Sequence, residues 1–389
     1  LFSLLFIPLS ILLFNQATPA GFLANIVAIP ALGFLVLPLT LLASFFAVLD
    51  FAALGWLFSV LDKITGWLID YLQFLQTSVL PASSFADRPG ILLASLAIAI
   101  FILLLPVNWR ARVPAVVLLI VAFCWQPGGV PDNSFRMTVL DVGMGTAVAV
   151  ETRHHTLIYD FGPGNADGFS AGDWVVRPYL HYRGIEKLDL MVISHVDSDH
   201  SGGFISFKDE IDTVALVSGT PQALAERFKL KNTVPDCHSY APWRWDGVDF
   251  EFIASPLSSV STSTNNQSCV LKVSAKHSVL LSGDIEAEQE TSLVHRHASN
   301  LAADVLLAPH HGSLSSSTES FIDAVGAGLV IFTAGRNNRW GFPRPQVVAR
   351  YQQTGSQIYR SDTDGAVTLL STPGDLYVDH WRKAKRIWH

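Results

Sequence analysis

The chain has 389 residues, of which 50% are hydrophobic and 15% are charged, and its formal net charge is −7. The hydrophobic share is high for a wholly soluble protein, and the negative charge argues against a basic protein that coats nucleic acid. Residues 1–130 carry only four basic and four acidic side chains, so the net negative charge lies in residues 131–389. This contrast predicts a membrane region, 1–130, followed by a globular domain, 131–389.

The membrane region is predicted to be an N-terminal α-helical transmembrane bundle. Its candidate spans are residues 1–14, 22–48, 91–107 and 113–125. Pro30 and Pro38 are expected to kink the second span. The chain starts inside an apolar run at Leu1, so we expect it to be a fragment of a longer protein; a signal peptide is the alternative for residues 1–20.

Residues 54–75 differ from these spans, because leucines and aromatic residues recur at helical spacing while Asp62, Lys63 and Asp70 interrupt the other side. This pattern predicts an amphipathic helix, either at the lipid interface or lining a polar path. Arg110 and Arg112 lie between the last two spans. The positive-inside rule places that loop in the cytoplasm and the globular domain on the outer side.

From Phe135 onward, the sequence changes to short β-rich runs separated by turns. The predicted strands are residues 135–140, 147–150, 157–161, 188–193, 213–217, 250–254, 270–273, 279–281, 305–308, 329–333 and 366–370. The predicted helices are residues 204–209, 222–228, 286–297, 319–325 and 345–353. This arrangement predicts an α+β fold of two sheets packed face to face and covered by helices.

The three cysteines, Cys124, Cys237 and Cys269, show neither metal-ligand spacing nor a disulfide framework. We expect Cys237 and Cys269 to be buried thiols rather than a bridge. Cysteine usage therefore does not indicate the compartment.

One short segment concentrates groups that bind metal ions, directly after the predicted strand 188–193. It contains two imidazoles and two carboxylates: His195, Asp197, Asp199 and His200. Gly202 and Gly203 follow, where the backbone can turn. Imidazole and carboxylate suit zinc, manganese and iron, and four such groups exceed what one ion needs from a single loop. We expect a centre of two ions; a solvated polar turn is the alternative.

Two further strand ends carry polar side chains. Asp284 follows the strand 279–281, where a carboxylate could bridge two cations, although a helix cap is an equally good explanation. His310 and His311 follow the strand 305–308. Adjacent imidazoles at a strand end are uncommon as packing residues, so we expect at least one of them to be a ligand.

These motifs, in this order, resemble the ComEC family of DNA-uptake channels in naturally competent bacteria. Residues 131–389 resemble its metallo-β-lactamase domain, an αββα sandwich, and residues 1–125 resemble the end of its membrane competence domain. The resemblance rests on Leu140-Asp141-Val142-Gly143, Tyr159-Asp160-Phe161-Gly162, residues 195–203, Asn265-Asn266-Gln267-Ser268, Ser282-Gly283-Asp284, residues 308–313 and Asp364-Gly365-Ala366.

The resemblance implies a role for each residue of the site. His195 and Asp197 would hold one divalent cation, and Asp284 would bridge it to a second. Asp199 and His200 would hold that second cation, together with whichever member of the adjacent pair, His310 or His311, reaches it. Asp197 stands where the broader fold has a histidine, which favours manganese without excluding zinc.

Other residues are implied to support the site. Asp160 would orient a ligand histidine. Asn266 and Ser268 lie where many members of the fold place another ligand histidine, so the first cation would be weakly held. Arg336 and Arg339 follow the strand 329–333 and would contact phosphates, with a solvated loop as the alternative.

The chain departs from the family pattern at Met144, Thr146 and Phe342. These residues replace polar groups near the expected mouth of the site, which puts the efficiency of hydrolysis in question but not the metal core.

The resemblance implies a multi-pass protein of the bacterial inner membrane whose globular domain faces the periplasm. The domain would be a metal-dependent nuclease that degrades one DNA strand while the other enters the channel, with Asp199 orienting the attacking water. Its partners would be single- and double-stranded DNA, membrane lipid and other proteins of the uptake machinery. The alternatives are a catalytically inactive structural domain and a hydrolase of another substrate.

Overall fold

The computed structural model describes residues 16–17, 19–48, 54–75, 83–84, 90–125, 128–165, 168–211, 214–254, 261 and 263–383. The predicted span 1–14 lies outside these residues. The chain divides into two compact units, Leu1–Pro127 with His181–Gly184, and Gly128–Leu180 with Ile185–His389. Each unit has apolar clusters of its own.

The N-terminal unit contains a long apolar helical stretch, formed by α2 (Pro19–Pro30), η1 (Ala31–Val36) and α3 (Leu37–Val48). Between the two prolines the helix is π-helical, and the Leu37 amide donates to the carbonyl of Leu32. Since proline has no amide hydrogen to donate, the helix loses its regular α-helical bonding where the sequence predicts a kink. Residues Leu23–Ala47 are long and apolar enough to cross a membrane.

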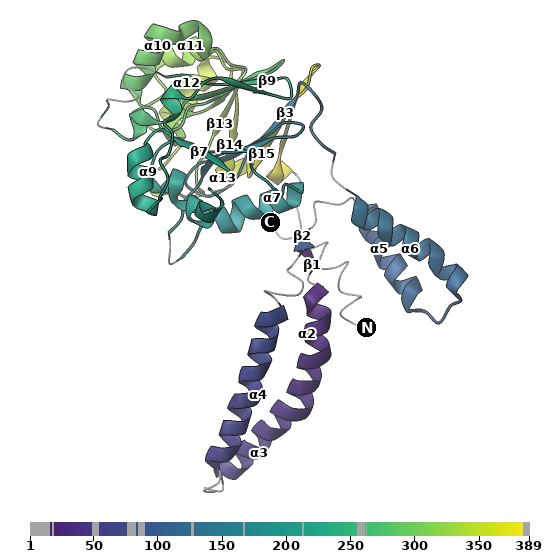
Figure 1. Cartoon of the computed structure of the whole chain (residues 1–389). Helices are drawn as coiled ribbons and strands as arrows, with labels where there is room; N and C mark the ends of the chain where they lie inside the picture. Colours follow the sequence, from purple (N-terminus) through teal and green to yellow (C-terminus); the bar gives the residue numbers. More distant parts are fainter. Residues whose placement is uncertain are drawn as a thin grey trace. The chain divides into compact units, whose positions relative to one another are not determined.

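Helix α4 (Leu54–Phe74) spans the residues that are predicted to form an amphipathic helix. Leu57 and Leu61 are buried against Ala43 of α3, whereas the charged residues Asp62 and Lys63 are exposed. Figure 1 shows α4 running back alongside α2 and α3. The short strands β1 (Gln16–Ala17) and β2 (Ser83–Ser84) pair antiparallel in the same unit.

Helices α5 (Gly90–Leu104) and α6 (Trp109–Cys124) pack against each other and cover the other two predicted spans. They have 15 and 16 residues, whereas a transmembrane helix needs about 20. Within the described residues, one helix therefore meets the criteria of both length and apolar composition. A multi-pass arrangement stays a prediction.

The C-terminal unit is built on two seven-stranded mixed sheets (Figure 1). The first has the order β16-β15-β3-β4-β5-β6-β7. Its strands are β3 (Phe135–Val139), β4 (Ala147–Glu151), β5 (Thr156–Phe161), β6 (Leu190–Ile193), β7 (Ala215–Ser218), β15 (Val367–Ser371) and β16 (Leu376–His380). The second has the order β14-β13-β12-β11-β10-β9-β8. Its strands are β8 (Trp243–Trp245), β9 (Val248–Phe252), β10 (Leu271–Ser274), β11 (Ser278–Leu281), β12 (Val305–Leu307), β13 (Leu329–Phe332) and β14 (Gln357–Arg360).

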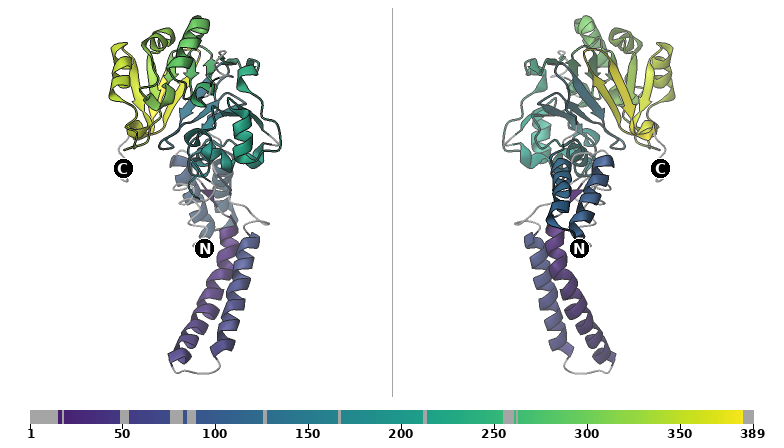
Figure 2. Two further views of the ribbon diagram at one scale, coloured as in Figure 1. Left: turned by 90° about the vertical axis from the view of Figure 1, so that its left-hand side faces the viewer. Right: turned by 90° about the vertical axis from the view of Figure 1, so that its right-hand side faces the viewer.

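Helices and helical turns join and cover these strands, and Figure 2 shows them on the outer sides of the C-terminal unit. On the first sheet they are η3 (Gly172–Val176), α7 (Arg177–Arg183), α8 (Ser198–Ser201), η4 (Gly202–Ser206), η5 (Lys208–Glu210) and α9 (Pro221–Phe228). The later ones are η6 (Cys237–Ser239), η7 (Asn265–Gln267), α10 (Ala287–Leu301), η8 (Pro309–Gly312), α11 (Glu319–Val325), α12 (Pro345–Gln353), α13 (Ser361–Asp364) and η9 (Trp381–Lys383).

Three apolar clusters define the layers of this unit. One lies between the sheets and includes Met137, Leu157 and Val305, all essentially without solvent exposure. A second joins the outer face of the first sheet to its helices through residues such as Phe204, and a third joins the other sheet to α10, α11 and α12 through residues such as Phe321. The C-terminal unit is therefore the expected sandwich of two sheets between helices.

Several predicted elements need correction. Residues 204–209, predicted as a helix, form the 3₁₀ turns η4 and η5. The strands β8, β14 and β16 were not predicted, and all three lie at sheet edges. Edge strands carry more polar side chains than central ones, so they lack the apolar runs on which the prediction depended.

The expectation of two separate buried thiols is wrong, because Cys237 and Cys269 form a disulfide with a Cα–Cα distance of 6.0 Å. The two residues are 32 positions apart in the chain, and both lie in the core between the sheets. Their pairing depends on the fold, which brings η6 beside the start of β10, and so it could not be read from their spacing.

Candidate metal centre

The candidate ligand loop begins where β6 ends, and Asp160 at the end of the neighbouring strand β5 holds it in place. The Asp160 carboxylate accepts hydrogen bonds from the amide of Ser194, from the Ser194 hydroxyl and from Nδ1 of His200, each at 2.7 Å. Because Nδ1 of His200 donates to this carboxylate, its Nε2 is free to face the site. These contacts support the role expected for Asp160.

Gly202 and Gly203 are needed for close packing rather than for an unusual backbone angle. A Cβ atom on Gly202 would lie 2.2 Å from the amide nitrogen of Gly164, and one on Gly203 would lie 2.1 Å from the carbonyl oxygen of Phe161. Any larger residue would push this segment away from β5. The two glycines therefore allow the ligand loop to pack directly against the backbone at and just after the end of β5.

Four of the predicted ligands come together at one point: Asp199, His200, Asp284 and His311. Nε2 of His200 lies 3.1 Å from Oδ1 of Asp284 and 3.2 Å from Nε2 of His311. Nε2 of His311 lies 3.3 Å from a carboxylate oxygen of Asp199 and 3.3 Å from one of Asp284. Ligands bound tetrahedrally at about 2.1 Å are about 3.4 Å apart, so this spacing fits one divalent cation.

His195 and Asp197 lie beside this cluster and form a second candidate position. Nδ1 of His195 contacts the hydroxyls of Ser194 and Ser268, at 3.0 and 3.3 Å. Its Nε2 is fully buried and has no hydrogen-bond partner among the described residues, and a carboxylate oxygen of Asp197 lies 3.8 Å away. A buried polar atom without a partner is costly, so a cation here fits the residues that are present.

The structure distinguishes the two adjacent histidines at the end of β12. His311 is buried in the cluster, and its Nδ1 lies 2.9 Å from the hydroxyl of Thr333. His310 lies at the rim, with its Nε2 3.8 Å from Asp284 and its Nδ1 3.1 Å from the Ser315 hydroxyl. Both have positive φ angles, 49° and 54°, a sparsely populated backbone conformation for residues other than glycine.

The electrostatics of the cluster favour positive charge. Burial lowers the pKa of His311, but the charge of Asp284 and hydrogen bonds to Asp199 and Asp284 outweigh burial and raise this pKa to about 9. Burial raises the pKa of Asp284, yet His200 and His311 hold it well below its usual range. Burial and the neighbouring His200 lower the pKa of His195. A bound metal ion would take the place of the protons that this cluster attracts.

Asn266 and Ser268 support the site from the loop before β10. The Asn266 side chain accepts a hydrogen bond from the amide of Glu286 at 2.9 Å, so it braces the segment that follows Asp284. The Ser268 hydroxyl accepts from the amide of Asp284 at 3.1 Å. Both residues are buried and hold the backbone of this turn.

Of the departures from the family pattern at residues 144 and 146, Thr146 makes hydrogen bonds that support the cluster. The Thr146 hydroxyl bonds to the Thr333 hydroxyl at 3.0 Å, which in turn contacts His311. The Thr146 amide donates to the carbonyl of Asp199 at 3.0 Å. Thr146 therefore contributes to the polar support of the cluster. Met144 is half-buried beside Gly335.

Two supporting residues were missed in the sequence. Thr333 follows the apolar strand β13, and only its position at a strand end could have singled it out. Arg227 of α9 donates to the carbonyl of Val196 at 2.7 Å and contacts the Ser198 hydroxyl at 3.3 Å, so it clamps the ligand loop from outside. Arg336 and Arg339 are exposed on the loop after β13.

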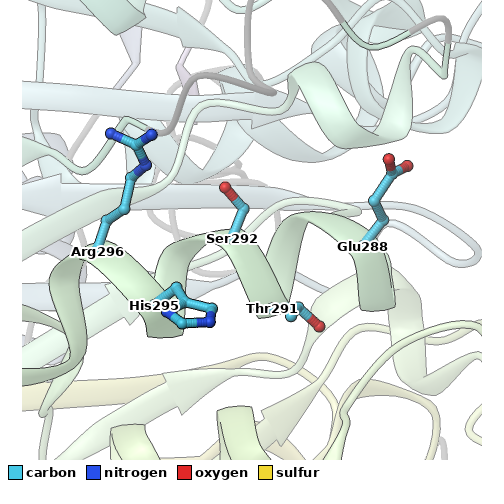
Figure 3. A pocket seen from close by; sticks show the side chains of 5 residues that line it. All are labelled: Glu288, Thr291, Ser292, His295 and Arg296. Atoms are coloured by element: carbon cyan, nitrogen blue, oxygen red, sulfur yellow. The ribbon is translucent and has the colours of Figure 1, made fainter.

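A hollow on helix α10 is a separate feature. Figure 3 shows its five lining side chains, Glu288, Thr291, Ser292, His295 and Arg296, all on the same helix. The side chains do not converge on one point, whereas those of the metal-binding cluster come from three different strand ends. The hollow is therefore a groove along one helix surface.

Comparison with protein families assigns both regions. Residues 140–331 match the family described as the metallo-beta-lactamase superfamily. Residues 1–112 match the family described as competence protein.

Individual relatives give the same result. The chain is 33% identical over 370 residues to the competence protein ComA of Neisseria gonorrhoeae, a match that covers 94% of this chain and 50% of that protein. It is 26% identical over 346 residues to ComE operon protein 3 of Bacillus subtilis, covering 77% of this chain and 42% of that protein. The chain spans about half the length of the curated relatives it matches.

Among solved structures, the metallo-beta-lactamase fold protein YhfI from Bacillus subtilis is similar to this chain. The TM-score is 0.39 and the identity 14%, over 64% of this chain and 99% of that protein.

Proposed function

This chain is a ComEC-family competence protein with a metallo-β-lactamase domain, and we propose that this domain is a metal-dependent nuclease. In this proposal it hydrolyses the DNA strand that is not transported, while the membrane region passes the other strand. The observation that carries the proposal is the cluster of Asp199, His200, Asp284 and His311 beside the unpartnered Nε2 of His195.

The donor set would hold two cations, manganese or zinc. His195 and Asp197 would bind one of them, and Asp199, His200 and His311 would bind the other, with Asp284 between the two. When bound, such cations supply Lewis acidity, which neutralises phosphate charge and lowers the pKa of an attacking water. Oxygen ligands make up half of this set, which suits manganese better than an all-histidine site would.

The chain's own residues divide the site into a buried and an open side. His195, His200 and His311 are buried, whereas the side chains of Asp197 and Asp199 are 46% and 32% exposed. A phosphodiester would therefore approach from the aspartate side. Asp199 lies at that opening within 3.3 Å of His311, so it is the residue best placed to orient a water by hydrogen bonding.

The charge of the domain limits how strongly it binds DNA. The chain has a net charge of −7, and affinity for nucleic acid depends largely on lysine and arginine contacts with phosphate. The affinity of the domain for single- or double-stranded DNA would therefore be modest and sensitive to salt, and it would depend on a local patch of the surface. A local set of arginines that includes Arg336 and Arg339 would supply it.

The same proposal places the protein in the bacterial inner membrane as a multi-pass protein, in contact with lipid and with other uptake proteins. The globular domain would face the periplasm. Arg110 and Arg112, which lie in the first turn of α6, support this orientation through the positive-inside rule. The Cys237–Cys269 disulfide is independent support, since disulfides persist in oxidising compartments outside the cytoplasm.

The experiment uses the whole chain purified in detergent. We expect two equivalents of bound metal and manganese-dependent cleavage of linear single-stranded DNA. Asp199→Ala should lower the cleavage rate at least about 100-fold, because it removes both a ligand and the group that orients water. Asp323→Ala is the matched control, since Asp323 is exposed on α11, and it should cleave at the wild-type rate.

The other outcomes separate the alternatives. Binding of two metal ions without DNA cleavage would identify a structural or regulatory domain. Hydrolysis of a small ester or lactam without DNA cleavage would identify a hydrolase of a different substrate class.

A further inference from the structure

The loop between β13 and α12 lies at the rim of the metal-binding cluster. Its residues 336–344, Arg-Asn-Asn-Arg-Trp-Gly-Phe-Pro-Arg, are named here the aromatic–arginine loop. The ring of Phe342 packs edge-on against the ring of His310, with centroids 5.9 Å apart. The amide of Arg344 donates to the carbonyl of Gly312, at 3.0 Å. The loop is therefore attached directly to the segment that carries His310 and His311.

The aromatic–arginine loop is braced from within. The Asn338 side chain donates to the carbonyls of Gly335 and Phe342, at 2.9 and 2.6 Å, and accepts from the amide of Phe342 at 2.9 Å. Pro343 is buried against Gly312, where a Cβ atom would lie 2.6 Å from the proline side chain. A loop that is already ordered loses little conformational entropy when it binds a ligand.

The exposed side of this loop combines positive charge with an aromatic surface. Arg336, Arg339 and Arg344 are exposed, and residues 336–344 include no acidic residue, although the chain as a whole is acidic. Trp340 is 42% exposed, and the Arg339 guanidinium lies 4.2 Å from the centre of its ring system. Arginine together with an accessible indole is the combination that binds phosphates and stacks an unpaired base.

We propose that the aromatic–arginine loop binds the single-stranded end of a nucleic acid, with a base stacked on Trp340 and phosphates held by Arg336, Arg339 and Arg344. The proposal rests on the proposed nuclease function, to which it adds the form of the substrate. A base inside a duplex has both faces covered by its neighbours, so stacking on Trp340 selects an unpaired end. The contact with His310 places that end beside the metal-binding cluster.

The test measures binding without cleavage. The whole chain in detergent is titrated against a fluorescein-labelled oligothymidylate in buffer with a chelator, and fluorescence anisotropy gives the dissociation constant. Trp340→Ala should weaken binding roughly 10-fold, the usual loss for one stacked base, and Trp340→Phe should recover most of it. Trp174→Ala is the matched control, because Trp174 is 72% exposed elsewhere on the C-terminal unit. It should bind like the wild type.

Two further measurements probe the charge and the strandedness. The double variant Arg336→Gln/Arg339→Gln should reduce the slope of log affinity against log salt by about 0.7 for each phosphate that the loop no longer neutralises. A blunt duplex of the same length should bind more weakly than the single strand, and Trp340→Ala should not change duplex binding.

Three results with Trp340→Ala would overturn the proposal. The variant could bind the oligothymidylate with wild-type affinity, it could lose as much affinity for the duplex as for the single strand, or it could lose binding to anionic vesicles while it keeps binding to DNA. The last would identify the loop as a membrane contact. The proposed nuclease is judged separately. Trp340-dependent binding in a chain that never cleaves DNA would refute the nuclease and leave the loop proposal standing, whereas cleavage with Trp340-independent binding would do the reverse.

Discussion

Each histidine in the cluster is oriented by the bond made by its other ring nitrogen. Nδ1 of His200 bonds to the Asp160 carboxylate and Nδ1 of His311 bonds to the Thr333 hydroxyl, which continues to Thr146. The Asp160 carboxylate can only accept, so it fixes the hydrogen on Nδ1 of His200, and both bonds hold the rings with Nε2 facing the cluster. The metal affinity of the site should therefore depend on residues that never contact the ion.

Thr333→Val tests this dependence at one hydroxyl. The substitution keeps the shape of the side chain but removes the hydrogen-bond partner of Nδ1 of His311, so metal affinity should fall at least about 10-fold. Competition with a chromophoric chelator measures the affinity. Thr333→Ser retains the hydroxyl and should restore affinity close to that of the wild type. Unchanged affinity in the valine variant would show that the Thr333 bond does not orient His311.

At this scale, the sequence predicted residues that the structure brings together, but not every contact that they make. The spacing of His195, Asp197, Asp199 and His200 predicted a metal site because few other functions need that composition. The choice between His310 and His311 could not be made, because the two are adjacent, and only the folded structure shows that His311 is buried while His310 lies at the rim.

At the scale of elements, the site lies at the carboxyl ends of parallel strands in both sheets. β5 and β6 are a parallel pair in one sheet, and β11, β12 and β13 are parallel neighbours in the other. The cluster and its supports follow these strands in the chain. Since all parallel strands of a sheet end at the same edge, residues far apart in sequence converge there.

Helix α10 is held to α11 by a buried carboxylate. Glu290 accepts hydrogen bonds from the amides of Ser317 and Thr318, at 2.5 and 2.7 Å, just before α11 begins. Burial raises the pKa of this carboxyl, against the lowering effect of these two amides. The carboxylate nevertheless satisfies two amide groups that have left the solvent.

We expect Glu290→Gln to lower the free energy of unfolding by about 1–3 kcal/mol, because the glutamine offers one acceptor oxygen to two amide donors. Urea denaturation followed by tryptophan fluorescence measures the change. Glu288→Gln, at an exposed position of the same helix, is the control and should change the free energy by less than about 0.5 kcal/mol. Equal effects of the two substitutions would contradict the assigned bonds.

Central and edge elements differed in how well the sequence predicted them. The helices α11 and α12 and the central strands were predicted because they bury an apolar face. β14, which lies at an edge, was missed, since its side chains are half-buried or exposed and show no apolar run.

At the scale of the whole molecule, the disulfide links two distant parts of the C-terminal unit. Cys269 lies next to Ser268, which bonds to Asp284 and contacts His195, so the bridge braces the loop behind the candidate metal site. The amide of Cys269 also donates to the carbonyl of Ser194, at 3.1 Å.

Removing the bridge with Cys237→Ser/Cys269→Ser should destabilise the C-terminal unit by about 3–4 kcal/mol, the value expected for closing a loop of this length in the unfolded chain. Chemical denaturation with and without a reductant measures the difference. The wild type with reductant should match the double variant, and Cys124→Ser, which removes an exposed thiol of the other unit, should respond to reductant as the wild type does. A denaturation midpoint insensitive to reductant would argue against the bridge.

The sequence by itself determined the contrast between an apolar and a globular region, most of the central strands and the residue types of the candidate metal site. These features come from local composition, periodicity and motif spacing, which do not depend on how distant segments meet. Only the tertiary structure decided the Cys237–Cys269 pairing, the inward position of His311 and the support from Thr333 and Arg227. Each of these depends on contacts between segments far apart in the chain, and such contacts exist only once the two sheets have packed together.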